Sequence, residues 1–320
     1  MSHGNGHTKS KGHGESNGKP TGKKVRPGTA LNEYLTFQLT ELEEYLPLAA
    51  AADPEAIHAA RLALRRFRSV TTCFKPLLPA LPADDVARLK KLARQLGESR
   101  DAYVLAQRLT LALDTRESWR RMSALRGFVE ALNAHAAQRA AAVTGAGGVA
   151  RRGYPALLSL RQALETRPPD ESPTEAKARN RIPRRAVTAA LQDRWERVQQ
   201  YMEQSLAEVP EDRHNRDLHE VRKELKCLRY AAESVAPGYK GAALAIVQPA
   251  IALQRLLGEQ HDAVVSRLVL AQAAGVHSID SRDAAALDEL ESHRAANAEV
   301  EYYRAAAMNP VPAPASALAR

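Results

Sequence analysis

One internal repeat constrains the fold of this chain more than any other sequence feature. A histidine and three basic residues with helical spacing occur twice, and each matching pair is separated by 161 positions: His58, Arg61, Arg65 and Arg68 match His219, Arg222, Lys226 and Arg229. Residues 58–104 and 219–265 share 14 identical residues without a gap. Unrelated amphipathic helices would not keep one offset across two helices and the loop between them, so the sequence predicts two homologous halves packed about a pseudo-two-fold axis.

The composition and the start and stop signals predict an all-α protein. Aromatic residues make up only 5% of the chain, and the abundant unbranched side chains lose little rotamer freedom in a helix. Apolar spacing, capping residues and prolines predict eight helices, at about 29–45, 53–76, 84–113, 115–143, 183–209, 211–235, 241–273 and 281–307. The fold class expected is therefore two four-helix bundles related by internal duplication and pseudo-two-fold symmetry.

The distribution of charge and of Gly and Pro sets the boundaries of these bundles. Residues 1–29 hold six basic residues and one acid, which is +5 of the net charge of +9, and they have almost no apolar residues; such a segment cannot bury enough surface to fold. We expect a disordered basic arm at 1–29 and a flexible tail at 308–320. The folded domain then spans 30–307, with a first half at 30–145, a linker at 146–182 and a second half at 183–307.

Several classes of protein are excluded by what the sequence lacks. Two cysteines, Cys73 and Cys227, are too few for a disulfide framework or a thiolate zinc site, which favours a reducing compartment. The N-terminus has no apolar core of a signal peptide, and no apolar run approaches the length of a membrane span. No phosphate-binding loop of the G-x-x-x-x-G-K-[ST] type is present. We expect a cytoplasmic protein that does not interact with membranes.

The repeated basic residues form a stripe along one face of each helix. Positions 58, 61, 65 and 68 fall within about 80° around a helix and extend about 15 Å along it. Like charges at this spacing destabilise a helix slightly, so their repetition in both halves indicates a ligand. Arginine suits a linear oxyanion, because its planar fork donates two hydrogen bonds to a phosphate and keeps its charge. Secondary contacts are expected from flanking residues: Arg66, Lys75 and Lys223.

Neither the histidines nor the repeated acids predict catalysis or a metal site. His219 has no carboxylate or histidine one turn away, and nearby arginines would repel a cation, whereas an anion would favour the protonated imidazole. Four carboxylates resemble general acid/base pairs, but we interpret them as groups that hold basic side chains in place or support packing near the repeated glycines: Glu98, Asp101, Glu259 and Asp262. We therefore expect no catalytic residue, metal or cofactor.

The paired motif H-x-x-R-x-x-x-R/K-x-x-R, followed each time by L-G-E-x-x-D, resembles the CHAD family, named for its conserved histidine α-helical domain. The resemblance covers about residues 30–307. It implies two four-helix bundles with a basic central cleft that binds inorganic polyphosphate, and an association with polyphosphate granules. Carried over by motif position, the polyphosphate contacts are His58, Arg61, Arg65, Arg68, His219, Arg222, Lys226 and Arg229. The chain departs from a symmetric pattern at Arg100, whose counterpart is His261.

Two other functions stay open at this point. The basic arm and the net charge allow non-specific nucleic-acid binding, although few aromatic residues are available to stack on bases. His219 with the pair His261-Asp262 faintly resembles the ligands of helical metal-dependent phosphohydrolases, but the equivalent pair in the first half is Arg100-Asp101. Non-enzymatic binding of inorganic polyphosphate, which the resemblance implies, is the function we expect.

Overall fold

The computed structural model describes residues 25–49, 53–115, 123–144, 149–165, 182–275 and 281–319, and all regular secondary structure in these ranges is helical, as predicted. The α-helices are α1 (Pro27–Ala49), α2 (Pro54–Cys73), α3 (Ala83–Thr115), α4 (Ser123–Thr144), α5 (Val149–Glu165), α7 (Arg184–Ser205), α8 (Glu211–Val235), α9 (Leu244–Gly275), α10 (Ser281–Met308) and α11 (Pro314–Ala317). Two short 3-10 helices follow α2 and α8: η1 (Lys75–Leu77) and η3 (Ala236–Tyr239).

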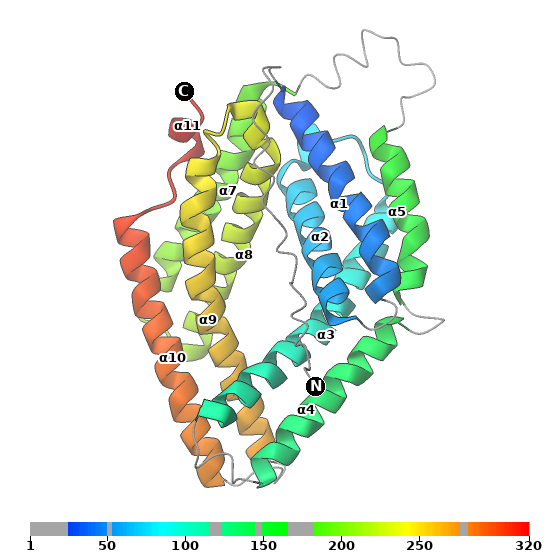
Figure 1. Cartoon of the computed structure of the whole chain (residues 1–320). Coiled ribbons are helices and arrows are strands. Elements are labelled where there is room, and N and C mark those ends of the chain that lie inside the picture. Colours follow the sequence, from blue (N-terminus) through cyan, green and yellow to red (C-terminus); the bar gives the residue numbers. More distant parts are fainter. Residues whose placement is uncertain are drawn as a thin grey trace, which may run out of the picture.

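The helices form two groups that lie side by side (Figure 1). In the first group α1 contacts α2 and α5, and α3 also contacts α2 and α5, which closes a bundle of four helices. In the second group α7, α8, α9 and α10 contact one another in chain order. Helices α2 and α8 pack together and join the groups, so the two predicted basic stripes lie on neighbouring helices. The internal duplication and its symmetry axis stay predictions.

Helix α2 begins where the sequence places its cap. The Asp53 carboxylate accepts hydrogen bonds from the backbone amides of Glu55 and Ala56, and Pro54 occupies the first helical position, where its missing N–H costs nothing. At the join with α8, the Cys227 thiol donates to the Ser69 carbonyl at 3.3 Å. Burial raises the pKa of the Cys227 thiol to about 11, so this cysteine is a neutral packing residue.

One expected boundary is wrong: the segment 146–182 includes a core helix. Helix α5 lies in this range and buries an apolar stripe at helical spacing: Ala156, Leu157, Leu160 and Leu164. At Gly153 an added Cβ would lie 2.9 Å from Leu92 Cδ2, so the glycine allows close packing of α5 on α3. Helix α5, and not the predicted helix at 115–143, completes the first bundle. Helix α4 packs along α3 instead (Figure 1).

Both predicted flexible ends need correction where the structure describes them. The end of the predicted arm belongs to α1, where Pro27 is buried and packs so closely on η3 that a Cβ at Gly238 would lie 2.7 Å from Pro27 Cα. The predicted tail is folded on α7: the Trp195 indole N–H donates to the Val311 carbonyl at 2.8 Å, and Leu318 is buried. Residues 1–24 of the predicted arm lie outside the described residues.

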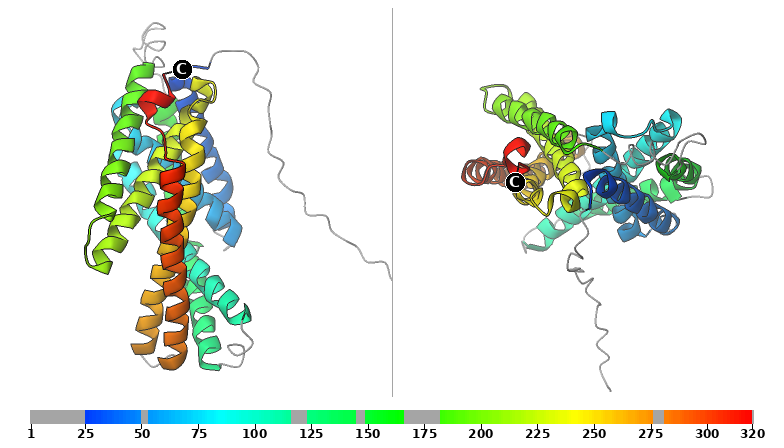
Figure 2. Two further views of the ribbon diagram at one scale, coloured as in Figure 1. Left: turned by 90° about the vertical axis from the view of Figure 1, so that its left-hand side faces the viewer. Right: turned by 90° about the horizontal axis from the view of Figure 1, so that it is seen from above.

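Two apolar clusters hold the fold together. The larger runs through both groups, from α1, α2, α3 and α5 to α7, α8, α9 and the end of α10. The smaller joins α3 and α4 to α9 and α10 at the opposite end of the molecule, where α9 and α10 extend beyond α7 (Figure 2). The basic face of α8 lies near α2 and α3 of the first group and α9 of the second.

Candidate functional site

A cavity of about 320 Å³ opens between the two groups and takes one wall from each of α2, α3, α8 and α9. Its polar lining is predominantly basic: Arg61, Arg65, Asp101, Arg108, His219, Arg222, Lys226, His261, Asp262 and Ser266. Val104, Leu105 and Val265 complete it. Side chains from both halves of the sequence thus meet in one cleft, which we call the basic cleft.

Five of the eight predicted contact residues line the basic cleft, and three do not. Arg61 and Arg65 reach it from α2, and His219, Arg222 and Lys226 reach it from α8. The remaining three occupy the ends of the two stripes: His58, Arg68 and Arg229. Of these, His58 and Arg68 are exposed, whereas Arg229 is held by Glu233 with an Nε–Oε1 distance of 2.6 Å.

The predicted secondary residues lie away from the cleft lining. Arg66 lies over the Tyr230 ring, with its guanidinium carbon 5.8 Å from the ring centroid. Lys75 is exposed in η1, and Lys223 pairs with the Glu220 carboxylate at 2.7 Å. These residues are useful as controls, because they are basic neighbours of the cleft residues.

The repeated carboxylates contact arginines. Asp101 accepts a hydrogen bond from Arg61 Nη2 at 2.8 Å, and Asp262 lies 3.9 Å from Arg222 Nη2. The same arginines lie against the repeated glycines: a Cβ at Gly97 would be 3.7 Å from Arg61 Nε, and one at Gly258 would be 3.6 Å from Arg222 Nη2. An added Cβ at either glycine would make only an ordinary van der Waals contact with the arginine, so the distances place each arginine beside its glycine without showing that glycine is required there.

The crowding of positive charge shifts the pKa of several cleft residues. Burial, followed by the charges of Arg222, Arg65 and Arg61, lowers the pKa of Lys226 to about 6. Burial and the same kind of repulsion lower the pKa of His219, and they lower that of His261 to about 3. An anion in the cleft would reverse the local potential and favour the protonated form of each group.

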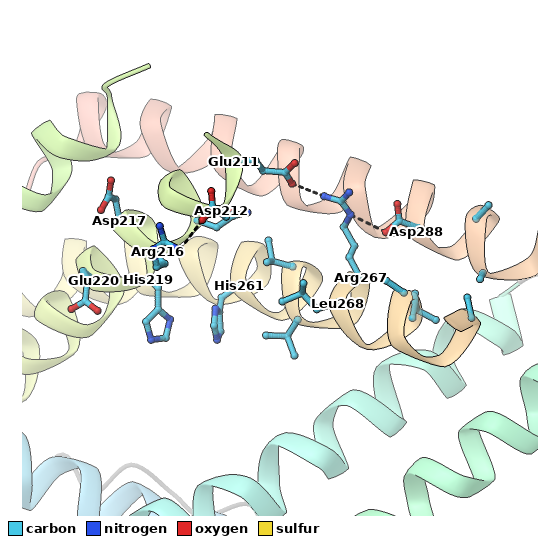
Figure 3. A pocket seen from close by; sticks show the side chains of 18 of the residues that line it. Glu211, Asp212, Arg216, Asp217, His219, Glu220, His261, Arg267, Leu268 and Asp288 are labelled. Carbon is cyan, nitrogen blue, oxygen red and sulfur yellow. Dashed lines mark hydrogen bonds and ion pairs between the residues drawn. The ribbon is translucent and has the colours of Figure 1, made fainter. Parts of the chain in front are cut away.

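His219 of α8 and His261 of α9 lie side by side at one edge of the cleft, with ring centroids 4.5 Å apart (Figure 3). Two buried nitrogens here, His219 Nδ1 and Arg222 Nε, have no hydrogen-bond partner among the described residues. A buried donor without a partner is unfavourable unless a ligand satisfies it. No cluster of three or more metal-ligating side chains occurs in the described part of the chain, and the arginines would repel a cation. The unused Arg222 Nε–H donor suits an anion.

Sequence reasoning missed two cleft residues, Arg108 and His261, as contacts. The Arg108 guanidinium extends from α3 and lies 2.7 Å from both Glu259 and Glu291, on α9 and α10. Arg108 lies two turns after Asp101 and therefore on the same face of α3, so its place beside the repeated acid could have been predicted from the sequence. Its acidic partners are 151 and 183 residues away, and no local pattern connects them.

A second and larger cavity, of about 1230 Å³, adjoins the basic cleft and shares His219, His261 and Val265 with it. It runs along α8, α9 and α10 (Figure 3). Its polar edge is mainly acidic, and Arg267 there is held by Glu211 and Asp288 at 2.8 and 3.0 Å. The acids make this cavity a poor site for a polyanion, so the basic cleft is the candidate site.

Comparison with known proteins identifies the family. The sequence matches the CHAD domain family over residues 33–271, so this chain belongs to the CHAD domain family. The fold is similar to the crystal structure of the CHAD domain from the plant Ricinus communis, with a TM-score of 0.58, 18% identity and coverage of 96% of this chain and 97% of that one.

The fold is also similar to PptA from Streptomyces chartreusis, with a TM-score of 0.62, 20% identity and coverage of 88% of this chain and 99% of that one. A comparison with curated protein sequences gives no significant match. Within the described residues, no helix combines the length and the apolar character that crossing a membrane requires.

Proposed function

We propose that this protein binds inorganic polyphosphate in the basic cleft without turning it over. The observation that carries the proposal is that Arg61 and Arg65 of α2 and Arg222 and Lys226 of α8 line one cavity. A linear chain of phosphates presents oxygens along its whole length, so it can contact both helices at once. Guanidinium groups donate bidentate hydrogen bonds to such oxygens and stay charged.

The charge balance of the cleft supports an anionic ligand. Five cationic-type side chains line it, against two carboxylates, Asp101 and Asp262. Both carboxylates face arginines, so neither is positioned as a free general base. Arg65 and Lys226 form no ion pair with any described carboxylate, and this leaves both side chains available to a ligand.

Adjacent arginines on α2 offer a matched test. Arg65 lines the cleft, whereas Arg66 lies over Tyr230. A hydrogen bond to a charged group contributes about 1.5–3 kcal/mol, so Arg65→Gln should weaken binding of fluorescently labelled polyphosphate roughly 10- to 100-fold. Arg66→Gln should change the affinity less than about threefold. Equal losses in both variants would show that binding follows net charge and not the cleft.

Binding should also depend steeply on salt, because neutralising a polyanion releases its condensed counterions. Anisotropy titrations at increasing salt measure this dependence, and an affinity that stays constant would contradict the electrostatic account. Incubation with polyphosphate should release no orthophosphate. Competition with DNA at equal phosphate concentration tests the alternative ligand: displacement of polyphosphate by DNA would favour nucleic-acid binding.

The proposal includes a location in the cell. A protein that binds polyphosphate should gather where the polymer is stored, so we place it in the cytoplasm at polyphosphate granules. A fluorescent fusion should co-localise with granules in the wild type and become diffuse with Arg65→Gln. A fusion that stays diffuse in granule-containing cells would contradict this part of the proposal.

A further inference from the structure

Lys226 differs from the other basic residues of the cleft in its surroundings. Its neighbours in the cavity include Arg61 and Arg65 on α2, and Arg222 lies one turn before it on α8. The two carboxylates of the cleft contact arginines and not this amine, at 2.8 Å for Asp101 and 3.9 Å for Asp262. The Lys226 amine is therefore partly buried among cations.

In the empty cleft, this setting produces a neutral amine at physiological pH. Burial and the three arginines lower the pKa of Lys226 to about 6. At pH 7 such an amine is neutral in about nine molecules of ten, whereas an ordinary lysine is neutral in roughly one of 2,500. A neutral lysine amine is a nucleophile that attacks carbonyl carbons.

The same cavity also contains donors for a phosphate group. Arg65 has no acidic partner among the described residues, and the buried Arg222 Nε has no hydrogen-bond acceptor there. A cavity of about 320 Å³ is large enough for a small organic phosphate, since ligand pockets begin at about 300 Å³. The cleft thus combines phosphate donors with a nucleophilic nitrogen.

We propose that Lys226 forms imines with small aldehydes that carry a phosphate group. The arginines bind the phosphate, and the Nζ lone pair attacks the aldehyde carbon to form a C–N bond. The resulting carbinolamine loses its hydroxyl and a nitrogen proton as water, which leaves a C=N bond. Nothing is oxidised or reduced, and no co-reactant is required.

This inference rests on the proposed anion site, and it adds a second class of ligand to that site. An aldehyde attached to Lys226 would occupy the same arginines that polyphosphate uses. Phosphorylated aldehydes should therefore compete with polyphosphate for the cleft.

Reductive trapping tests the proposal. We would incubate the full chain with pyridoxal 5′-phosphate at pH 7, reduce the imine with borohydride, and locate the modified lysines by peptide mass spectrometry. Lys223, on the exposed side of the same helix and paired with Glu220, is the internal reference. The free-amine advantage of Lys226 is partly offset by the lower nucleophilicity of a weaker base and by the bound phosphate, whose charge raises the pKa of the amine, so labelling should exceed that of Lys223 several-fold. Equal labelling of the two lysines would overturn the proposal.

The role of the phosphate is tested separately. Pyridoxal, which lacks the phosphate, should label Lys226 at least about tenfold less, and Arg65→Gln should reduce labelling by pyridoxal 5′-phosphate while Arg66→Gln should not. Equal labelling by the two aldehydes would overturn the phosphate requirement.

Polyphosphate binding by the same preparation distinguishes the two proposals. If polyphosphate binds but Lys226 is not labelled preferentially, the imine proposal fails and the polyphosphate proposal stands. Preferential, phosphate-dependent labelling without any polyphosphate binding would support the imine proposal and refute the proposed function.

Discussion

Polyphosphate binding should strengthen as the pH falls, because Lys226 must gain a proton to act as a cation. In the empty cleft, burial and three arginines lower its pKa to about 6. Protonating such an amine costs about 2.7 kcal/mol at pH 8 and about 0.4 kcal/mol at pH 6. If polyphosphate holds Lys226 protonated at both pH values, affinity should rise roughly 50-fold between them.

The sign of the effect follows from linkage. A bound anion raises the pKa of Lys226, so the complex holds more protons than the empty protein between the two pKa values, and binding takes up protons in that window. His219 acts in the same direction, since its pKa is also lowered in the empty cleft. His58 is exposed outside the cleft lining, so His58→Gln should leave the dependence unchanged.

Anisotropy titrations with long-chain polyphosphate across this pH range measure the affinity. Calorimetry in two buffers of different ionisation enthalpy measures the proton uptake directly. Lys226→Met should remove most of the pH dependence, whereas Lys223→Met, on the same helix outside the cleft, should retain it. A full pH dependence in Lys226→Met would refute the reasoning, because the titrating group would then lie elsewhere.

Four further predictions concern binding and stability. Arg65→Glu and Lys226→Glu should each reduce polyphosphate affinity at least about 100-fold. In anisotropy titrations, the fold-loss of affinity in the double variant should be smaller than the product of the two single fold-losses, as expected if both residues contact one ligand. A double-variant loss equal to that product would indicate separate sites. Lys226→Met should raise the free energy of unfolding at pH 7, because it removes a buried amine that must lose its proton on folding. In the wild type, the free energy of unfolding should increase by about 1.4 kcal/mol per pH unit between about pH 6 and 10, where the unfolded chain holds more protons than the native state, and the variant should lack this increase. Urea titrations at several pH values measure both effects. Arg108→Leu should cost about 3 kcal/mol in urea unfolding, because it leaves the fully buried Glu291 with one ion-pair partner fewer; a loss below about 1 kcal/mol would contradict this account. Trp195→Phe should cost about 1 kcal/mol by the same measurement through the lost hydrogen bond to the C-terminal segment, and an unchanged midpoint would show that the segment is loosely held.

The sequence predicted helix bounds well where a proline or charged residues mark the end of the helix. The predicted bounds 211–235 of α8 agree with the structure, because Pro210 precedes the helix and acidic residues fill its first turn. Helix α5 was missed because Gly-rich and Pro-rich runs flank it, although its apolar stripe was visible. The fold of the C-terminal segment depends on Trp195, more than 100 residues earlier, and the Pro/Ala composition of the segment does not indicate such a partner.

For the candidate site, the stripe predicted the faces of α2 and α8 from which side chains reach the cleft, but not which turns of those faces line it. The first stripe contributes only its two middle residues to the cleft, whereas the second contributes all but its last residue, Arg229. Arg229 is a case where a local signal existed: Glu233, one turn later on the same helix, pairs with it, and Arg229 does not line the cavity. The repeated acids could be interpreted correctly because Arg61 and Asp101 recur at one offset as Arg222 and Asp262.

The larger apolar cluster has a consequence for folding, because it runs without interruption through both groups of helices. Helix α2 is packed on α8, and the start of α1 is packed on η3, so contacts between residues separated by some 200 positions complete the core. Contacts of such long range make folding slow, and a shared core makes unfolding cooperative. A chain cut between α5 and α7 would expose the apolar faces that now meet at α2 and α8. Neither half should persist as a monomer, and the two fragments should regain their helical structure only when they are mixed.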